Sequence, residues 1–67
     1  FFMWVVVSMA KSKQAADNIT AALSAEGILV KQKPIYKKVD EHKNYFEILV
    51  LGSEADAARE IIVEKGL

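Results

Sequence analysis

The side chains of this chain that are best suited to chemistry gather in its middle third. Five of the nine basic residues lie in segment 31–43, close to two tyrosines and the single histidine. These residues are Lys31, Lys33, Lys37, Lys38 and Lys43, with Tyr36, Tyr45 and His42. Such a cluster is suited to binding an anion or an acidic protein surface through charge-assisted contacts. Lysines on an edge strand also discourage pairing with other strands, and we favour this second interpretation.

Three further positions each allow a chemical and a structural interpretation. His42 serves either as a pH-sensitive proton-transfer group or as a solvated residue of a charged turn. The N–H groups at Gly52 and Ser53 suit a small anion, unless a capping box of Ser53 and Asp56 occupies them. Trp4 is either a flat surface for a ligand or an aromatic residue of a core or interface. We expect the structural role in each case.

Several classes of site are excluded by composition. The chain has no cysteine and one histidine, so we predict no disulfide, no metal site and no cofactor. It lacks the glycine-rich, P-loop, zinc-protease and nucleophile motifs, so we predict no catalytic residues and no enzyme activity. Nine basic and nine acidic residues cancel, which argues against a nucleic-acid partner.

The elements that position these residues begin with an uncharged apolar run, Phe1–Val7. A run of this kind is typical of a strand buried on both faces, and we expect that strand at about 2–8. It is much shorter than the roughly 20 residues of a membrane span, so we predict no membrane partner. We find no targeting motif and therefore expect a cytoplasmic protein. The chain has 67 residues and is 52% hydrophobic, which indicates a single domain, 1–67, with a marginal core.

Later segments alternate between helix and strand patterns. Ser12 is placed to cap a helix whose apolar stripe is Ala15, Ala16, Ile19, Ala22 and Leu23, with Gly27 at its end. A strand opens at 28, and Pro34 either ends it or places it at a sheet edge, where Ile35, Tyr36 and Val39 continue it irregularly. A third strand at 45–51 directs Phe46, Ile48 and Val50 to the core. A second helix starts at the Ser53–Asp56 capping box, buries Ala55, Ala58, Ile61 and Ile62, and ends at Lys65-Gly66.

This order predicts an α+β fold: a truncated ferredoxin-like β-α-β-β-α arrangement, with a three-stranded mixed sheet and both helices on one face. If the third strand lies between the other two, as in a split β-α-β unit, the other two strands are edges, which agrees with Pro34. The first strand is then a long apolar edge, and the second sheet face is open and partly apolar. We therefore predict a homo-oligomer, with a dimer favoured. The pattern does not decide which side of the first strand faces outward, so the predicted self-association residues are Trp4, Val5, Val7, Tyr45 and Leu49.

Four stretches of the chain resemble one known family. They are Met3–Val7, Glu26–Val30, Tyr45–Val50 and the Glu-Ala-containing final helix. In these it is similar to a family of very small bacterial proteins catalogued as prokaryotic signal-transducing proteins. That resemblance implies a truncated ferredoxin-like fold near the PII nitrogen regulators, and it implies no ligand or catalytic residue.

Two classes of function remain open. The first is a regulatory or protein-interaction module that contacts a partner through a mobile turn at 37–44. Its predicted partner-binding residues are Lys33, Tyr36, Lys37, Lys38, His42 and Lys43, and its partner would be an acidic protein or an anionic small ligand. The second is a metabolite sensor with a ligand in a dimer groove, as in ACT-like domains, although 9–12 lack the glycine usual in such a turn.

Overall fold

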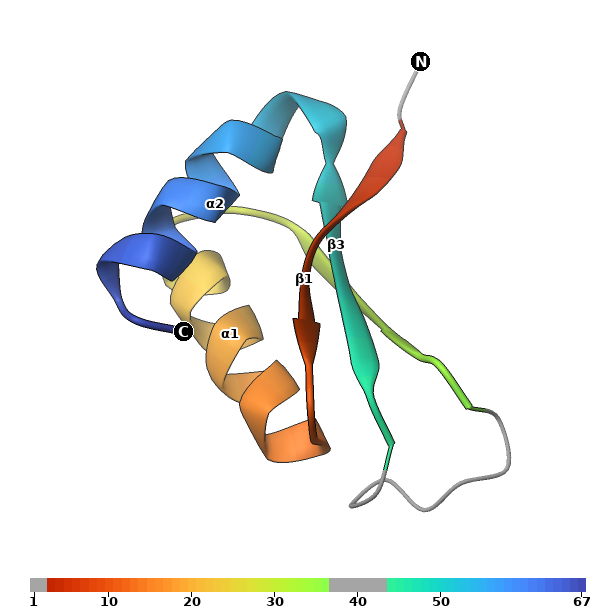
Figure 1. Cartoon of the computed structure of the whole chain (residues 1–67). Helices are drawn as coiled ribbons and strands as arrows, with labels where there is room; N and C mark the ends of the chain where they lie inside the picture. Colours follow the sequence, from red (N-terminus) through yellow and green to blue (C-terminus); the bar gives the residue numbers. More distant parts are fainter. Residues whose placement is uncertain (1–2, 37–43) are drawn as a thin grey trace.

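The computed structural model describes residues 3–36 and 44–67, which form one sheet and two helices (Figure 1). Its elements are β1 (Trp4–Ala10), α1 (Lys13–Ala25), β2 (Val30–Pro34), β3 (Phe46–Leu51), a 3-10 turn η2 (Gly52–Glu54) and α2 (Ala55–Glu64). The α+β class is confirmed, and the arrangement is compatible with a small ferredoxin-like half fold. No helix in these two ranges is both long and apolar enough to cross a membrane.

The three strands are ordered β1-β3-β2, and both ladders are antiparallel. The prediction of a mixed sheet is therefore wrong. β1 and β2 run in the same direction but are never neighbours, because β3 lies between them and runs opposite to both. Pro34 is the last residue of the edge strand β2, where its missing N–H removes no ladder bond from the sheet centre.

The core lies between the sheet and the two helices, which cover the same face of the sheet (Figure 1). Ile48 and Val50 of β3 are fully buried, and Phe46 is nearly so. The helices contribute Ala16, Ile19 and Leu23 from α1, and Ala55, Ala58 and Ile62 from α2. Alanine at the contact points lets the helices approach the sheet closely. The predicted inward face of β3 is confirmed, and so are the two predicted helix stripes except for Ala22, which is outside the core cluster.

A β-bulge in β1 decides which side chains of that strand face outward. Val6 pairs with Leu49, and Ser8 pairs with Ile48, the adjacent residue of β3. Val7 therefore has no partner on β3 and is the extra residue of the bulge. A bulge reverses the alternation of side chains along a strand. Even positions point away from the helices before the bulge, and an odd position, Met9, does so after it. β1 also lies two residues later than the predicted 2–8.

The two helices start in different ways. Ser12 caps α1 as predicted, and its Oγ accepts a hydrogen bond from the Ala15 amide at 3.1 Å. The predicted capping box at Ser53 is absent, because the chain enters α2 through η2 and no side chain caps Glu54, the residue before the helix. The Gly52 amide instead donates to the Met3 carbonyl at 2.8 Å, which extends the β1–β3 ladder by one bond. Gly27 has φ +81°, the left-handed conformation expected after α1.

Candidate functional site

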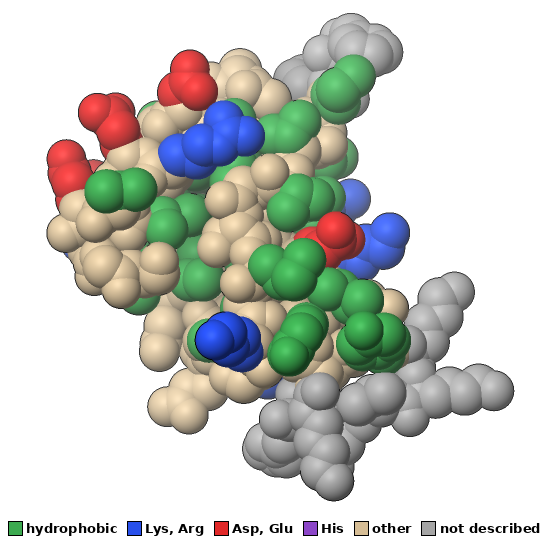
Figure 2. Space-filling view, viewed as in Figure 1, with side chains coloured by type: hydrophobic (Ala, Val, Ile, Leu, Met, Phe, Trp, Pro, Cys, Tyr) green, Lys and Arg blue, Asp and Glu red, His purple; other side chains and the backbone are tan. Residues whose placement is uncertain are grey.

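The side of the sheet opposite the helices is the main surface on which this molecule can act. We call it the outer face, and define it by residues whose alternation and pairing direct them away from the core. They are Trp4, Val6 and Met9 of β1, Glu47, Leu49 and Leu51 of β3, and Lys31 and Lys33 of β2. Val6 and Met9 are 43% and 56% exposed, and both helices lie on the opposite side of the sheet (Figure 1). Hydrophobic side chains gather on the strand side of the molecule (Figure 2).

Cross-strand pairing arranges the outer face in rows. One row pairs Trp4 with Leu51, and the next contains Val6, Leu49 and Lys31. A third row contains Met9, Glu47 and Lys33. The β1 and β3 columns are thus apolar apart from Glu47, and the β2 column is basic. Such a surface, apolar with a charged border, has the composition of a protein-interaction surface.

Trp4 and Lys31 are in contact across this face. The Lys31 ammonium lies 4.7 Å from the centroid of the Trp4 ring, although the two residues belong to opposite edge strands. A cation in this position over an indole is stabilised by about 0.5–1 kcal/mol at an exposed site. Lys31 therefore covers one face of the Trp4 ring. This contact favours the interpretation of Trp4 as an aromatic residue of an interface over its interpretation as a flat surface for a ligand.

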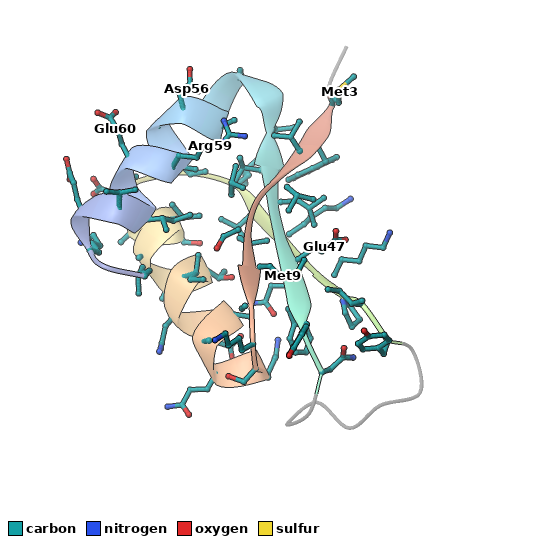
Figure 3. All side chains as sticks on the ribbon, in the orientation of Figure 1. Met3, Met9, Glu47, Asp56, Arg59 and Glu60 are labelled. Carbon is teal, nitrogen blue, oxygen red and sulfur yellow. The ribbon has the colours of Figure 1, made fainter. Side chains whose placement is uncertain are left out.

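Glu47 is the one acidic side chain of the outer face, and it points away from the helices (Figure 3). It is half-buried, in the central strand, with Met9 on one side and Lys33 directly opposite on the other. Within residues 3–36 and 44–67, neither Glu47 nor Lys33 forms an ion pair or a side-chain hydrogen bond. The Glu47 carboxylate and the Lys33 ammonium group thus belong to directly paired residues, and neither is bonded to a side chain of the described residues.

The predicted self-association residues divide between the two sides of the sheet. Trp4 and Leu49 lie on the outer face, and Tyr45, just before β3, is 45% exposed. Val5 and Val7 are a correction, because both pack against the core on the helix side. The apolar positions that β1 presents outward are instead Val6 and Met9.

The predicted partner-binding residues lie mostly outside the described residues, as is the case for Lys37, Lys38, His42 and Lys43. Lys33 is exposed on the edge strand, and Tyr36 is 53% exposed at its end. Asn44, which we had placed in the mobile turn, is 3% exposed. Its Oδ1 accepts from the Tyr36 amide at 3.1 Å and its Nδ2 donates to the Tyr36 carbonyl at 2.6 Å. Asn44 therefore belongs to the folded part of the hairpin.

A polar network that we did not predict closes the core beside α1. Gln32, on the inner side of β2, donates to Asp17 at 3.0 Å and to Thr20 at 2.8 Å, and accepts from the Lys13 ammonium at 2.8 Å. Lys13 also lies 3.2 Å from the Asp17 carboxylate. The hydrogen bond from Gln32, and then the one from Lys13, lower the pKa of Asp17 below its ordinary value of 3.8. Alternation along 30–34 would have placed Gln32 inward, but its partners on α1 are not readable from sequence.

The remaining charged surface offers little for binding. A shallow surface on α2 is lined by Asp56, Arg59, Glu60, Val63 and Glu64 (Figure 3). All five belong to one face of one helix, and among the described residues no second element faces them to enclose a ligand. In the described ranges, no group of three or more acidic or histidine side chains is arranged to hold a metal ion.

Comparison of the chain with family models, with curated proteins and with solved structures found no match. The inference of function therefore depends on the geometry of the outer face.

Proposed function

We propose that this chain is a small regulatory or protein-interaction module that acts by self-association and partner binding, in a ferredoxin-like half fold. The outer face is its association surface. The observation that carries the proposal is that Trp4, Val6, Met9, Leu49 and Leu51 form a continuous apolar group on the sheet side without helices. We further propose a cytoplasmic protein without catalytic activity.

The physical reason is the burial of apolar surface. Each square ångström of apolar area removed from water contributes about 25 cal/mol, and a small domain has little interior in which to place such side chains. Three strands of about six residues give a footprint of roughly 300 Å². This is small beside the approximately 800 Å² per partner of stable complexes. We therefore expect reversible association that depends on protein concentration.

Partner binding is proposed for the β2 edge and the segment after it. Lys33 and Tyr36 are exposed there, and four more predicted residues follow in the sequence. Their charge favours an acidic protein or an anionic small ligand. A short Asn-Gly connection in place of 37–43 should keep folding and self-association while it removes such binding.

Two neighbouring valines provide the experiment for self-association. Val6→Lys places a charge on the outer face, so the variant should fold while its association constant falls at least about tenfold. Val5→Lys directs the same side chain at the core, so the free energy of unfolding should fall by on the order of 2 kcal/mol or more. Sedimentation velocity measures association, and urea unfolding measures stability.

A parent protein that remains monomeric at every concentration up to millimolar would overturn the proposal. Association that survives Val6→Lys unchanged would place the interface elsewhere on the molecule. Val63→Lys is the matched control, because Val63 is exposed on α2, and this variant should associate like the parent.

A further inference from the structure

We infer that β1 pairs edge to edge with β1 of a second copy of this chain, antiparallel, about a two-fold axis at Val5. Backbone groups on the free edge of β1 make the contact, which joins the outer faces of the two copies into one wider surface. This inference rests on the proposed function, since it specifies how copies meet within the same self-association. Its basis is a difference between the two edges of the sheet.

One hydrogen bond fixes the direction of the backbone groups along β1. The Gly52 amide donates to the Met3 carbonyl, one step beyond the paired residues of β1 and β3. Bonded and non-bonded residue pairs alternate along an antiparallel ladder. Val5 is therefore bonded to β3, whereas the N–H and C=O groups of Trp4 and Val6 point to the free edge of the sheet.

The other edge of the sheet, at β2, is protected against a further strand. The Ile35 amide donates to the Tyr45 carbonyl, so by the same alternation the N–H groups of Val30 and Gln32 point to the free edge. Pro34 occupies the next such position and has no N–H to offer. In an antiparallel pairing of β2 with its own copy, a lysine would also stand opposite a lysine.

The β1 edge has neither form of protection. The strand Trp4–Ala10 contains no charged residue and no proline. In Figure 1, β1 lies in front of β3, and no described segment crosses in front of it. Free N–H and C=O groups on an uncharged edge accept a further strand. The bulge between Val6 and Ser8 confines that strand to the part of β1 before it, because the ladder is disrupted there.

Hydrogen bonding selects one register for a second copy. With Val5 opposite Val5 of the second copy, Trp4 of each copy stands opposite Val6 of the other, and the free groups of both residues are satisfied. With Val6 opposite itself, the ladder would run through the bulge. With Trp4 opposite itself, Val6 would pair with a residue before the start of β1. Only the first register uses all the free groups before the bulge.

The arrangement of the two edges explains why the partner is a second copy. When two β1 edges pair, the combined sheet ends on both sides at β2, with its lysines and Pro34. Assembly along the sheet then stops at two copies, whereas an extended segment of another protein would leave a new unprotected edge. Bonds between the copies replace bonds to water, so a ladder this short adds to the contact of the outer face and does not replace it.

Amide exchange of the parent chain is the first test. Hydrogen–deuterium exchange, followed by NMR for each residue, is measured below and well above the concentration at which the parent associates. The amides of Trp4 and Val6 should exchange at least about tenfold more slowly in the associated state. Those of Val30 and Gln32 face the protected edge and serve as the control, and their rates should not change.

The outcomes of this experiment separate the inference from the proposed function. If the parent associates while Trp4 and Val6 exchange at unchanged rates, the edge pairing is wrong and the association of the outer face still stands. If the parent does not associate, both are wrong.

Two proline variants test the same N–H groups by removal. Val6→Pro removes an N–H that points to the free edge and no bond of the ladder with β3, as Pro34 does on β2. Each copy then loses one bond of the junction, so the dissociation constant should rise at least about tenfold. Val30→Pro makes the same change at the β2 edge and should associate like the parent. Equal effects of the two variants would overturn the inference.

An ester variant protects this test against misfolding. Circular dichroism shows whether Val6→Pro folds. If it does not, chemical synthesis of the chain with an ester in place of the Val6 amide removes the same N–H and keeps the side chain. The same increase of the dissociation constant is expected, and an unchanged constant would overturn the inference.

A contact between α-protons locates the axis. In a non-bonded antiparallel pair the two Cα atoms are only about 4.5 Å apart, which brings their protons close together. In a mixture of isotope-labelled and unlabelled chains, a filtered nuclear Overhauser experiment should therefore connect the Val5 α-protons of two copies. The absence of this signal in the associated state would exclude an axis at Val5.

Discussion

Ser12 and Ser53 each stand just before a helix, yet their side chains do different things. The Ser12 hydroxyl accepts a hydrogen bond from the Ala15 amide, which would otherwise have no partner in the first turn of α1. At Ser53 the backbone forms a 3-10 turn, and no side chain caps the helix that follows. A hydroxyl stabilises a helix only where the backbone around it leaves an amide within reach.

Ser12→Ala should therefore lower the free energy of unfolding by about 1 kcal/mol, as the loss of an N-cap does in other proteins. Ser53→Ala is the matched control and should change it by less than about 0.5 kcal/mol. Urea unfolding of both variants, followed by far-ultraviolet circular dichroism, gives the comparison. Equal losses in the two variants would contradict the assignment of the cap.

Asp17 gives the chain a dependence on acid pH. Its pKa is lowered mainly by the hydrogen bond from Gln32 and secondly by Lys13. A carboxyl whose pKa is lower in the folded state contributes stability that is complete above its unfolded pKa, near 3.9. That contribution is lost as the pH falls through the folded value. Stability should thus decline below about pH 4.

Gln32→Ala removes the largest cause, so the pKa of Asp17 should rise toward its ordinary value. Carboxyl carbon NMR titration of parent and variant measures the shift directly. Lys13→Met removes both the second hydrogen bond and the attraction of the ammonium charge, and should also raise the pKa of Asp17. In Asp17→Asn, the loss of stability below pH 4 should be smaller than in the parent, because the contribution of Asp17 is absent. An Asp17 pKa that stays the same in Gln32→Ala would show that the hydrogen bond has no such effect.

The hairpin of β2 and β3 has hydrogen bonds beyond the ends of its two strands, at 35–36 and 44–45. Ile35 donates to the Tyr45 carbonyl at 2.9 Å, and the next pairing uses the Asn44 amide side chain in place of a backbone partner. An amide side chain offers one donor and one acceptor, the same groups that a peptide unit offers. Asn44 thus continues the ladder by one step and buries its own polar atoms.

We expect Asn44→Ala to lower the free energy of unfolding by about 1–3 kcal/mol, since two groups of Tyr36 lose their partners. Asn44→Asp, of nearly equal size, should be at least as harmful above pH 5, because a carboxylate faces the Tyr36 carbonyl. Asn18→Ala, on the exposed surface of α1, provides the reference. Thermal unfolding in dilute solution ranks the three variants. If Asn44→Ala is as stable as Asn18→Ala, the hydrogen bonds of the Asn44 side chain do not stabilise the hairpin.

The whole molecule is a two-layer structure in which helices cover one face of the sheet and leave the other open. The covered face contains the core, and the open face combines apolar side chains with one carboxylate and two lysines. Association of a folded protein shifts its unfolding equilibrium by mass action. The proposed self-association therefore requires that the stability of this chain depend on its own concentration.

If the chain associates as proposed, dissociation accompanies unfolding, and the midpoint of thermal unfolding should rise as protein concentration increases a hundredfold. Differential scanning calorimetry measures this midpoint. In Leu49→Lys, which places a charge at the centre of the outer face, the midpoint should be independent of concentration. A midpoint that is constant in the parent would indicate that the folded chain is a monomer over that range.

Local patterns in the sequence were sufficient to predict several features of the fold. The stripes Ala16-Ile19-Leu23 and Ala55-Ala58-Ile62, and the alternation of Phe46, Ile48 and Val50, each identified a buried face. Ser12 and Gly27 marked the ends of α1, because both act through backbone geometry within one helical turn. Such features depend on residues close together in the chain and on no distant partner.

Other features depended on contacts between distant segments. The seven apolar residues of Phe1–Val7 have no alternation, so only pairing with β3 showed that Val6 faces outward and Val7 is the bulged residue. The chain enters α2 through a 3-10 turn whose first amide, that of Gly52, bonds to the Met3 carbonyl, and Asn44 is bonded to Tyr36. Strand register and side-chain hydrogen bonds depend on residues that are far apart in the sequence. A uniformly apolar strand has no alternation from which its register can be predicted. For that reason the tertiary structure alone decided that Val6 and Met9 of β1 belong to the outer face, whereas the alternation of β3 had already directed Glu47 outward.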